Sequence, residues 1–167
     1  METKQNNETA FAYFAGGCFW GVEYYFNKTE GVLDALSGFM GGHTLNPTYQ
    51  DICYKDTGHF EVVEVKYNPN LISYENLAKL FFEIHDPTQV DGQGPDIGTQ
   101  YLSAVFVQNS EEEKIVRNLI EKLEKKGLHV VTKILGKQEF YKAEEYHQYY
   151  YQKTGKTPYC HAHIKKF

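Results

Sequence analysis

Residues 9–27 read TAFAYFAGGCFWGVEYYFN, and the pattern changes halfway along this stretch. Thr9–Ala15 is apolar and aromatic and ends at two glycines, which is typical of a strand that stops in a tight turn. From Cys18 to Asn27 the apolar residues recur at the spacing of one helical face. We therefore expect a strand, a turn and a helix, with Cys18 where the helix begins.

The rest of the chain alternates between strand-like and helix-like segments. Phe60–Tyr67, FEVVEVKY, has a period of two that places Glu61 on the same face as valines. Ser73 is predicted to cap a helix that reaches Ile84. Further strands are expected at Gly31–Phe39, Gln100–Gln108 and His129–Leu135, and further helices at Lys142–Lys153 and from a capping box of Ser110 and Glu113 to Gly127.

This order of elements predicts an α+β two-layer sandwich with a ferredoxin-like βαββαβ core, in which helices cover one face of a mainly antiparallel sheet. Long loops at 41–49 and 85–98 and a coiled C-terminal tail from residue 154 complete it. A length of 167 residues fits one domain. We expect a flexible leader at residues 1–9 and a single domain at 10–167.

Composition excludes several classes of protein. The net charge is −5 and the basic residues are scattered, which argues against a nucleic-acid partner. The polar start lacks a signal sequence, and no apolar run approaches the ~18 residues of a membrane span. The three cysteines show no scaffold spacing and are expected to be thiols in a reducing compartment. We expect a cytoplasmic protein and a monomer.

Cys18 is the first candidate for chemistry. It follows Gly16 and Gly17 at a helix start, where unpaired backbone N–H groups and the helix dipole favour an anion. Such positions lower the pKa of a cysteine from about 8.5 to roughly 3.5–7.5. Cys18 is therefore predicted to be a reactive thiolate. The alternative is a small buried hydrophobic residue, which the glycine turn makes the weaker interpretation.

Glu61 is the second candidate. A carboxyl group among apolar neighbours on a strand resists ionisation, so Glu61 could donate a proton near pH 7. The alternative is an ordinary carboxylate on an edge strand. Phe19 and Trp20, beside Cys18, could wall an apolar pocket or could simply pack in the core.

The tail carries Cys160-His161-Ala162-His163. These residues could hold a metal, but no second Cys/His pair has a matching spacing, so no metal is expected. A cysteine on a mobile tail is suited to form a disulfide with another, oxidised cysteine. The alternative for Cys160 is an inert exposed thiol.

The stretch Gly17–Glu23, GCFWGVE, resembles the signature of the peptide methionine sulfoxide reductase A family. The resemblance extends from about residue 10 onward, through GGHTLNPTY (41–49), TGHFE (57–61), HDPTQ (85–89) and GTQY (98–101). It implies an enzyme that reduces methionine S-sulfoxide, free or in peptides and proteins. It also implies an external thiol reductant, thioredoxin or dithiothreitol, and no bound cofactor.

The resemblance implies a role for each motif residue. Cys18 attacks the sulfoxide sulfur and Glu61 protonates the oxygen. Tyr49 and Tyr101 donate hydrogen bonds to that oxygen, with Asp96 nearby. Phe19 and Trp20 form the walls around the substrate methyl group. Cys160 attacks the Cys18 sulfenic acid and forms a disulfide with Cys18, which thioredoxin then reduces.

Some positions depart from the family pattern. Phe60 stands where a small residue is usual, Asp91 and Gly92 where Asn-Arg is common, and Leu102 where Arg is common. These changes bear on substrate range. Cys53 is expected to be structural, and it is the alternative resolving cysteine.

Two other functions compete with the reductase. A cysteine hydrolase or acyltransferase would pair Cys18 with His43, His59 or His85 as base. A redox sensor or peptide-binding module would use the cysteines and aromatic residues without turnover.

Overall fold

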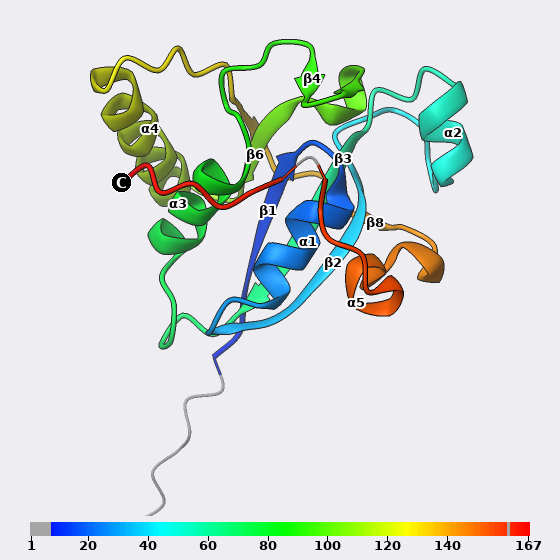
Figure 1. The fold of residues 1–167 in the computed structure, drawn as a ribbon, viewed down its shortest axis with the longest axis horizontal. Coiled ribbons are helices and arrows are strands. Elements are labelled where there is room, and N and C mark those ends of the chain that lie inside the picture. The colour runs from blue at the N-terminus through cyan, green and yellow to red at the C-terminus, as the bar shows by residue number, and fades with distance from the viewer. Residues whose placement is uncertain (1–7, 160) are drawn as a thin grey trace, which may run out of the picture.

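The computed structural model describes residues 8–159 and 161–167 as a mixed α/β fold around a mostly antiparallel sheet (Figure 1). The strand order is β7-β6-β1-β3-β2-β8, and only the β6–β7 pair is parallel. These strands are β1 (Ala10–Gly16), β2 (Val32–Met40), β3 (Phe60–Tyr67), β6 (Ser103–Val107), β7 (Lys133–Gly136) and β8 (Tyr141–Lys142). A separate hairpin pairs β4 (Gly92–Gln93) with β5 (Asp96–Ile97).

The long helices pack on one face of this sheet (Figure 1). Phe14 of β1 lies at the centre of that layer, with its ring 5.3 Å from Phe26 and 5.1 Å from Phe81. Burying one such side chain contributes roughly 1.5–3 kcal/mol. The helices are α1 (Phe19–Asn27), α2 (Tyr49–Tyr54), α3 (Tyr74–Ile84), α4 (Ser110–Lys125) and α5 (Tyr150–Thr154), with short 3-10 turns at Thr99–Tyr101 and Glu145–His147.

The opposite face of the sheet carries a second, smaller core. Successive side chains of a strand point to opposite faces, so Val63 packs under the helices while Val62 faces this second core. Phe60 also faces away from Glu61, with its ring 5.5 Å from that of Phe106. Its bulk therefore lies on the face opposite Glu61.

Several predicted elements are confirmed. The strand Phe60–Tyr67 has the predicted bounds, and the segment from residue 9 to residue 27 is a strand, a turn and a helix. Ser73 caps α3, since its side chain accepts the Asn76 N–H at 3.1 Å. Among the residues that the structure describes, every helix is too short or too polar to span a membrane.

The predicted capping box of Ser110 and Glu113 is wrong. Asn109 is the N-cap of α4, because its backbone is extended (φ −159°) and its side chain accepts the Glu112 N–H at 2.9 Å. Ser110 is the first helical residue. Gly127 follows the helix end with a φ of +93°, as the cap prediction requires.

The predicted helix Lys142–Lys153 is confirmed only at its end, since α5 spans Tyr150–Thr154, and it is wrong over residues 142–149. Tyr149 has a left-handed backbone (φ 56°), which interrupts a helix. The Gln148 side chain accepts the N–H of Ser37 and donates to its carbonyl, both at 2.8 Å, so this segment is bound to β2 instead. Tertiary hydrogen bonds therefore override the local helical pattern.

Other segments differ in their bounds. The loop 41–49 ends in the unpredicted α2, which starts with a capping box of Thr48 and Asp51. The predicted strands Gln100–Gln108 and His129–Leu135 are shorter, since β6 begins at Ser103 and β7 at Lys133. The loop 85–98 contains no helix, as predicted, but it does contain the β4–β5 hairpin.

The cap of α4 can be tested with two neighbouring alanine variants. Asn109→Ala should lower the free energy of unfolding by about 1 kcal/mol, because the Glu112 N–H loses its acceptor. The control Ser110→Ala should stay within about 0.5 kcal/mol of wild type. Urea denaturation followed by circular dichroism measures both, and an equal loss in the two variants would contradict the assignment.

Candidate active site

Cys18 lies in the N-cap position of α1 and is only 6% exposed. The preceding turn depends on Gly17, whose φ is +90°. A Cβ atom on Gly17 would lie 2.4 Å from Cβ of Gln93, so both its conformation and its surroundings require glycine. The thiol is thus at a helix N-terminus, as the sequence predicted.

Glu61 lies beside this helix start. Its side chain is 1% exposed, and Oε1 accepts the backbone N–H of Phe19, the first residue of α1, at 3.1 Å. Since β3 lies between β1 and β2, the edge-strand interpretation of Glu61 is wrong. The carboxyl group therefore shares the N-terminus of α1 with Cys18.

Two phenols approach the same carboxyl group from other elements. Burial raises the pKa of Tyr49, and the charge of Glu61 raises it further. Burial followed by the charge of Glu61 likewise raises the pKa of Tyr101, with Asp96 and Cys18 also contributing. Both hydroxyl groups therefore remain protonated at neutral pH and can donate hydrogen bonds.

Asp96 contacts the C-terminal tail. Its carboxylate accepts the hydroxyl of Tyr159 at 3.1 Å (Oδ2) and 3.3 Å (Oδ1). The predicted resolving residue, Cys160, is next in the chain but lies outside the described residues. Asp96 thus connects the hairpin near Tyr101 with the tail.

Trp20 lies in an aromatic cluster. Its indole N–H donates to Nδ1 of His147 at 3.0 Å, and its ring stacks on Tyr150 with centroids 3.8 Å apart. Burial lowers the pKa of His147, so its ring is neutral at physiological pH. Phe19 is 1% exposed, and its ring lies 5.3 Å from that of His147.

Sequence reasoning missed His147 and Tyr150. Both fall in the segment that was predicted to be one continuous helix, and neither has a spacing relative to Trp20 that signals contact. The left-handed Tyr149 lies between them and interrupts the helical pattern on which the prediction relied.

The tail contacts the rest of the fold over residues 161–167. The His161 ring is buried and donates from Nε2 to the Gly16 carbonyl at 2.6 Å, in a space left by the missing side chain of Gly21. Farther along, the Ile164 N–H donates to the Glu83 carbonyl at 2.9 Å. The tail therefore follows α1 and the end of α3.

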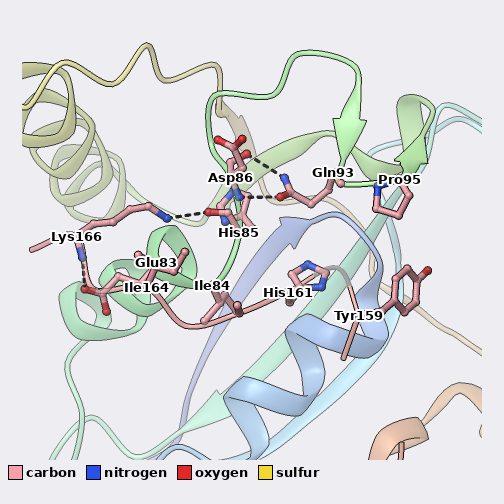
Figure 2. A pocket seen from close by; sticks show the side chains of 12 residues that line it. Glu83, Ile84, His85, Asp86, Gln93, Pro95, Tyr159, His161, Ile164 and Lys166 are labelled. Carbon is pink, nitrogen blue, oxygen red and sulfur yellow. Dashed lines mark hydrogen bonds between the residues drawn. The ribbon is translucent and has the colours of Figure 1, made fainter. Parts of the chain in front are cut away.

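An open cavity of about 460 Å³ lies between this tail and the loop 85–95 (Figure 2). The side chains of Tyr159, His161 and Lys166 line it from the tail, and His85, Asp86 and Gln93 line it from the loop. Neither Cys18 nor Glu61 lines the cavity. The cavity is therefore separate from the site formed by Cys18 and Glu61.

The histidines proposed as bases for a hydrolase are engaged elsewhere. His59 accepts the Gly42 N–H at Nδ1 and donates from Nε2 to the Thr44 carbonyl. His85 donates from Nδ1 to the Phe81 carbonyl, and burial lowers its pKa to about 3. His43 lies on the 41–48 loop beside Gly58. None of these contacts orients an imidazole toward Cys18.

The remaining sulfur and metal candidates have different surroundings. Cys53 is an exposed residue of α2 and forms a side-chain hydrogen bond with Tyr49, while partial burial of its sulfur raises its pKa. His161 and His163 bind separate partners, Gly16 and Glu83. Within residues 8–159 and 161–167, no three potential metal ligands cluster.

Known proteins resemble this chain over nearly its whole length. The family model for peptide methionine sulfoxide reductase matches residues 10–167. Peptide methionine sulfoxide reductase MsrA of Nautilia profundicola is 46% identical over 149 residues, 89% of this chain and 86% of its own.

Two solved structures of Mxr1 from Saccharomyces cerevisiae are also similar. The reduced form has a TM-score of 0.86 at 34% identity, over 94% of this chain and 93% of its own. The complex with Trx2 has a TM-score of 0.63 at 24% identity, over 98% and 96%. The second match bears on the fold alone.

The contact between Gly21 and the tail can be tested by adding one methyl group. In Gly21→Ala, Cβ would stand 2.2 Å from the His161 ring, so the tail must shift. Amide hydrogen exchange in the peptide 161–167 should become roughly tenfold faster, because overpacking favours the open tail. Gly136→Ala is the matched control, since its Cβ meets nothing within 4 Å. Unchanged exchange in Gly21→Ala would show that His161 does not depend on that space.

Proposed function

The chain belongs to the peptide methionine sulfoxide reductase family and is an enzyme that reduces methionine sulfoxide, and we propose that Cys18 and Glu61 are its catalytic pair. One observation carries this proposal. Glu61 accepts the N–H of the residue that follows Cys18, at 3.1 Å, in a site closed to bulk water. A nucleophile and a proton donor are thereby held at one helix terminus.

In the proposed reaction, the Cys18 thiolate attacks the sulfoxide sulfur while Glu61 gives a proton to the oxygen. Attack forms a transient sulfur–sulfur bond. As that bond and the substrate S–O bond break, the protonated oxygen passes to Sγ of Cys18 as a hydroxyl group, so methionine leaves and Cys18 becomes a sulfenic acid. Tyr49 and Tyr101 donate hydrogen bonds to the oxygen as negative charge develops on it. Their raised pKa values support this role, because only a protonated phenol can donate.

The substrate methyl group is proposed to contact Phe19 and Trp20. Aromatic walls with a few donors suit a group that is polar at one atom and apolar around it. The stacking of Trp20 on Tyr150 supports this arrangement. Selectivity for the S epimer follows from the family, since each class of sulfoxide reductase acts on one epimer.

Cys160 is proposed to attack the Cys18 sulfenic acid, which gives a disulfide and water. Its sequence neighbours support this, because Tyr159 contacts Asp96 and His161 contacts the Gly16 carbonyl. Thioredoxin would then reduce the disulfide, because a dithiol reductant exchanges with a disulfide through a mixed-disulfide intermediate. Dithiothreitol should replace thioredoxin as the reductant in vitro.

The proposal also covers the domain organisation, the type of core, the oligomeric state and the location of the protein. Residues 10–167 would form one catalytic domain, which is supported by the span of the family match, and residues 1–7 of the predicted leader at 1–9 lie outside the described residues. The order β6-β1-β3-β2, with α1 and α3 as crossovers, supports a ferredoxin-like core. Use of thiols as reagents suits a reducing compartment such as the cytoplasm. The protein is further proposed to be a monomer that needs no bound cofactor.

The catalytic roles can be tested with resolved epimers of a methionine sulfoxide peptide. With dithiothreitol, the wild type should consume only the S epimer and Cys18→Ser should be inactive. Glu61→Gln should lose a factor of roughly 10²–10⁴, the usual value of a general acid. Cys160→Ser should work with dithiothreitol but not with thioredoxin, and Cys53→Ser is the matched thiol control.

Each outcome bears on one role. If Cys53→Ser, and not Cys160→Ser, loses turnover with thioredoxin, then Cys53 is the resolving cysteine. An active Glu61→Gln variant would remove Glu61 as the proton donor. A wild type that leaves both epimers intact would refute the proposed function.

The phenol donors can be tested by removing one oxygen atom at a time. Tyr49→Phe and Tyr101→Phe should each lower kcat roughly tenfold, and more together, since their hydrogen bonds strengthen as charge develops. Tyr74→Phe is the control, because its buried hydroxyl has no hydrogen-bond partner among residues 8–159 and 161–167 and lies outside the site. Wild-type kcat in both site variants would exclude the donor role.

A further inference from the structure

We infer that Glu23 is a positioning residue that holds the aromatic cluster of Trp20, His147 and Tyr150 in place against α1. The inference rests on the proposed function in one respect, namely that Trp20 contacts the substrate. Glu23 itself is not proposed to touch the reacting atoms. It acts by binding the backbone of residues 147–150, the 147–150 turn.

Glu23 connects three elements through one buried carboxylate. It lies on α1 three residues after Trp20, and it is 1% exposed. Oε2 accepts the hydroxyl of Ser37 on β2, and Oε1 accepts the backbone N–H of Tyr149. Burial of a carboxylate costs free energy, and hydrogen bonds from the two donors offset that cost. The carboxylate therefore holds the two donors at fixed positions.

The backbone at Tyr149 shows what these bonds achieve. Tyr149 has φ 56° and ψ 36°, a conformation that is uncommon for a residue with a side chain. Its backbone and its side chain are each hydrogen-bonded: the N–H donates to Glu23, and the hydroxyl donates to Oδ1 of Asp34 at 2.5 Å. Functional sites often contain a residue whose unfavourable backbone conformation is maintained by the surrounding contacts.

The 147–150 turn delivers two side chains to Trp20. His147, before the turn residue Tyr149, accepts the indole N–H at 3.0 Å. Tyr150, directly after it, stacks on the indole with an interplanar angle of 11°. If the N–H of Tyr149 lost its acceptor, the turn would relax and both contacts with Trp20 would change.

The length of the Glu23 side chain matters more than its charge. Burial raises the pKa of Glu23 to about 7, and the charge of Asp34 adds to this, although the bonds from Ser37 and Tyr149 oppose it. A neutral form is therefore well populated near neutral pH. A neutral glutamine can accept the Tyr149 N–H with its oxygen and donate to Ser37 with its nitrogen.

Two substitutions separate length from charge. Glu23→Gln keeps the length and removes the charge, whereas Glu23→Asp keeps the charge but is one methylene shorter and cannot reach both Ser37 and Tyr149. Glu30→Asp, at an exposed position just after α1, is the matched control. Far-UV circular dichroism verifies that each variant is folded.

The readouts are the emission of Trp20, the only tryptophan in the chain, and steady-state kinetics with a methionine sulfoxide peptide. Glu23→Asp should change the emission spectrum, as Tyr150→Ala should do directly, and should raise KM roughly tenfold while kcat stays within about twofold. Glu23→Gln and Glu30→Asp should resemble wild type in both readouts. Alkylation of Cys18 should proceed at the wild-type rate in every variant.

Three outcomes would overturn the inference. Wild-type emission and KM in Glu23→Asp would show that the 147–150 turn does not need Glu23. An equal loss in Glu23→Gln would assign the effect to charge, and slower Cys18 alkylation would show a wider disturbance. If wild type reduced no sulfoxide, the proposed function would fail, while Trp20 emission would still test the positioning.

Discussion

The N-terminus of α1 places the strongest constraint on this structure. The first N–H groups of any helix have no partner within the helix, and a buried terminus must find acceptors elsewhere. Here Glu61 of β3 supplies one of them to Phe19, across 42 positions of sequence. The same contact that satisfies the helix start brings a carboxyl group to Cys18. Stability and the proposed chemistry therefore depend on one hydrogen bond.

The packing around this terminus explains the glycines of the motif. Gly17 permits the turn into α1, and Gly21 leaves room on α1 for the ring of His161. The tail thus rests directly on the helix that begins beside Cys18. On the other side, Glu23 binds the turn that carries His147. Three distant parts of the chain meet on a helix of nine residues.

The sequence allowed the main elements and the positions of Cys18 and Glu61 to be predicted, because both depend on local patterns. The alternation of Phe60–Tyr67 placed Glu61 on the helix-covered face, and the two glycines placed Cys18 at a helix start. The 147–150 turn could not be predicted in the same way. Its shape depends on Gln148 binding Ser37 and on Glu23 binding Tyr149, contacts that span more than a hundred positions. The cap of α4 was misplaced by one residue because Asn109 and Ser110 are both good N-caps, and only the extended backbone of Asn109 separates them.

The sheet order also governs how this protein behaves beside other extended chains. Its outermost strands are β7, with four residues, and β8, with two, while the longer strands β1, β2 and β3 lie inside. A short edge offers few unpaired N–H and C=O groups to a neighbouring strand, and β7 begins with Lys133. An extended polypeptide that approaches this protein therefore finds little backbone at either edge of the sheet to which it could add as a further strand.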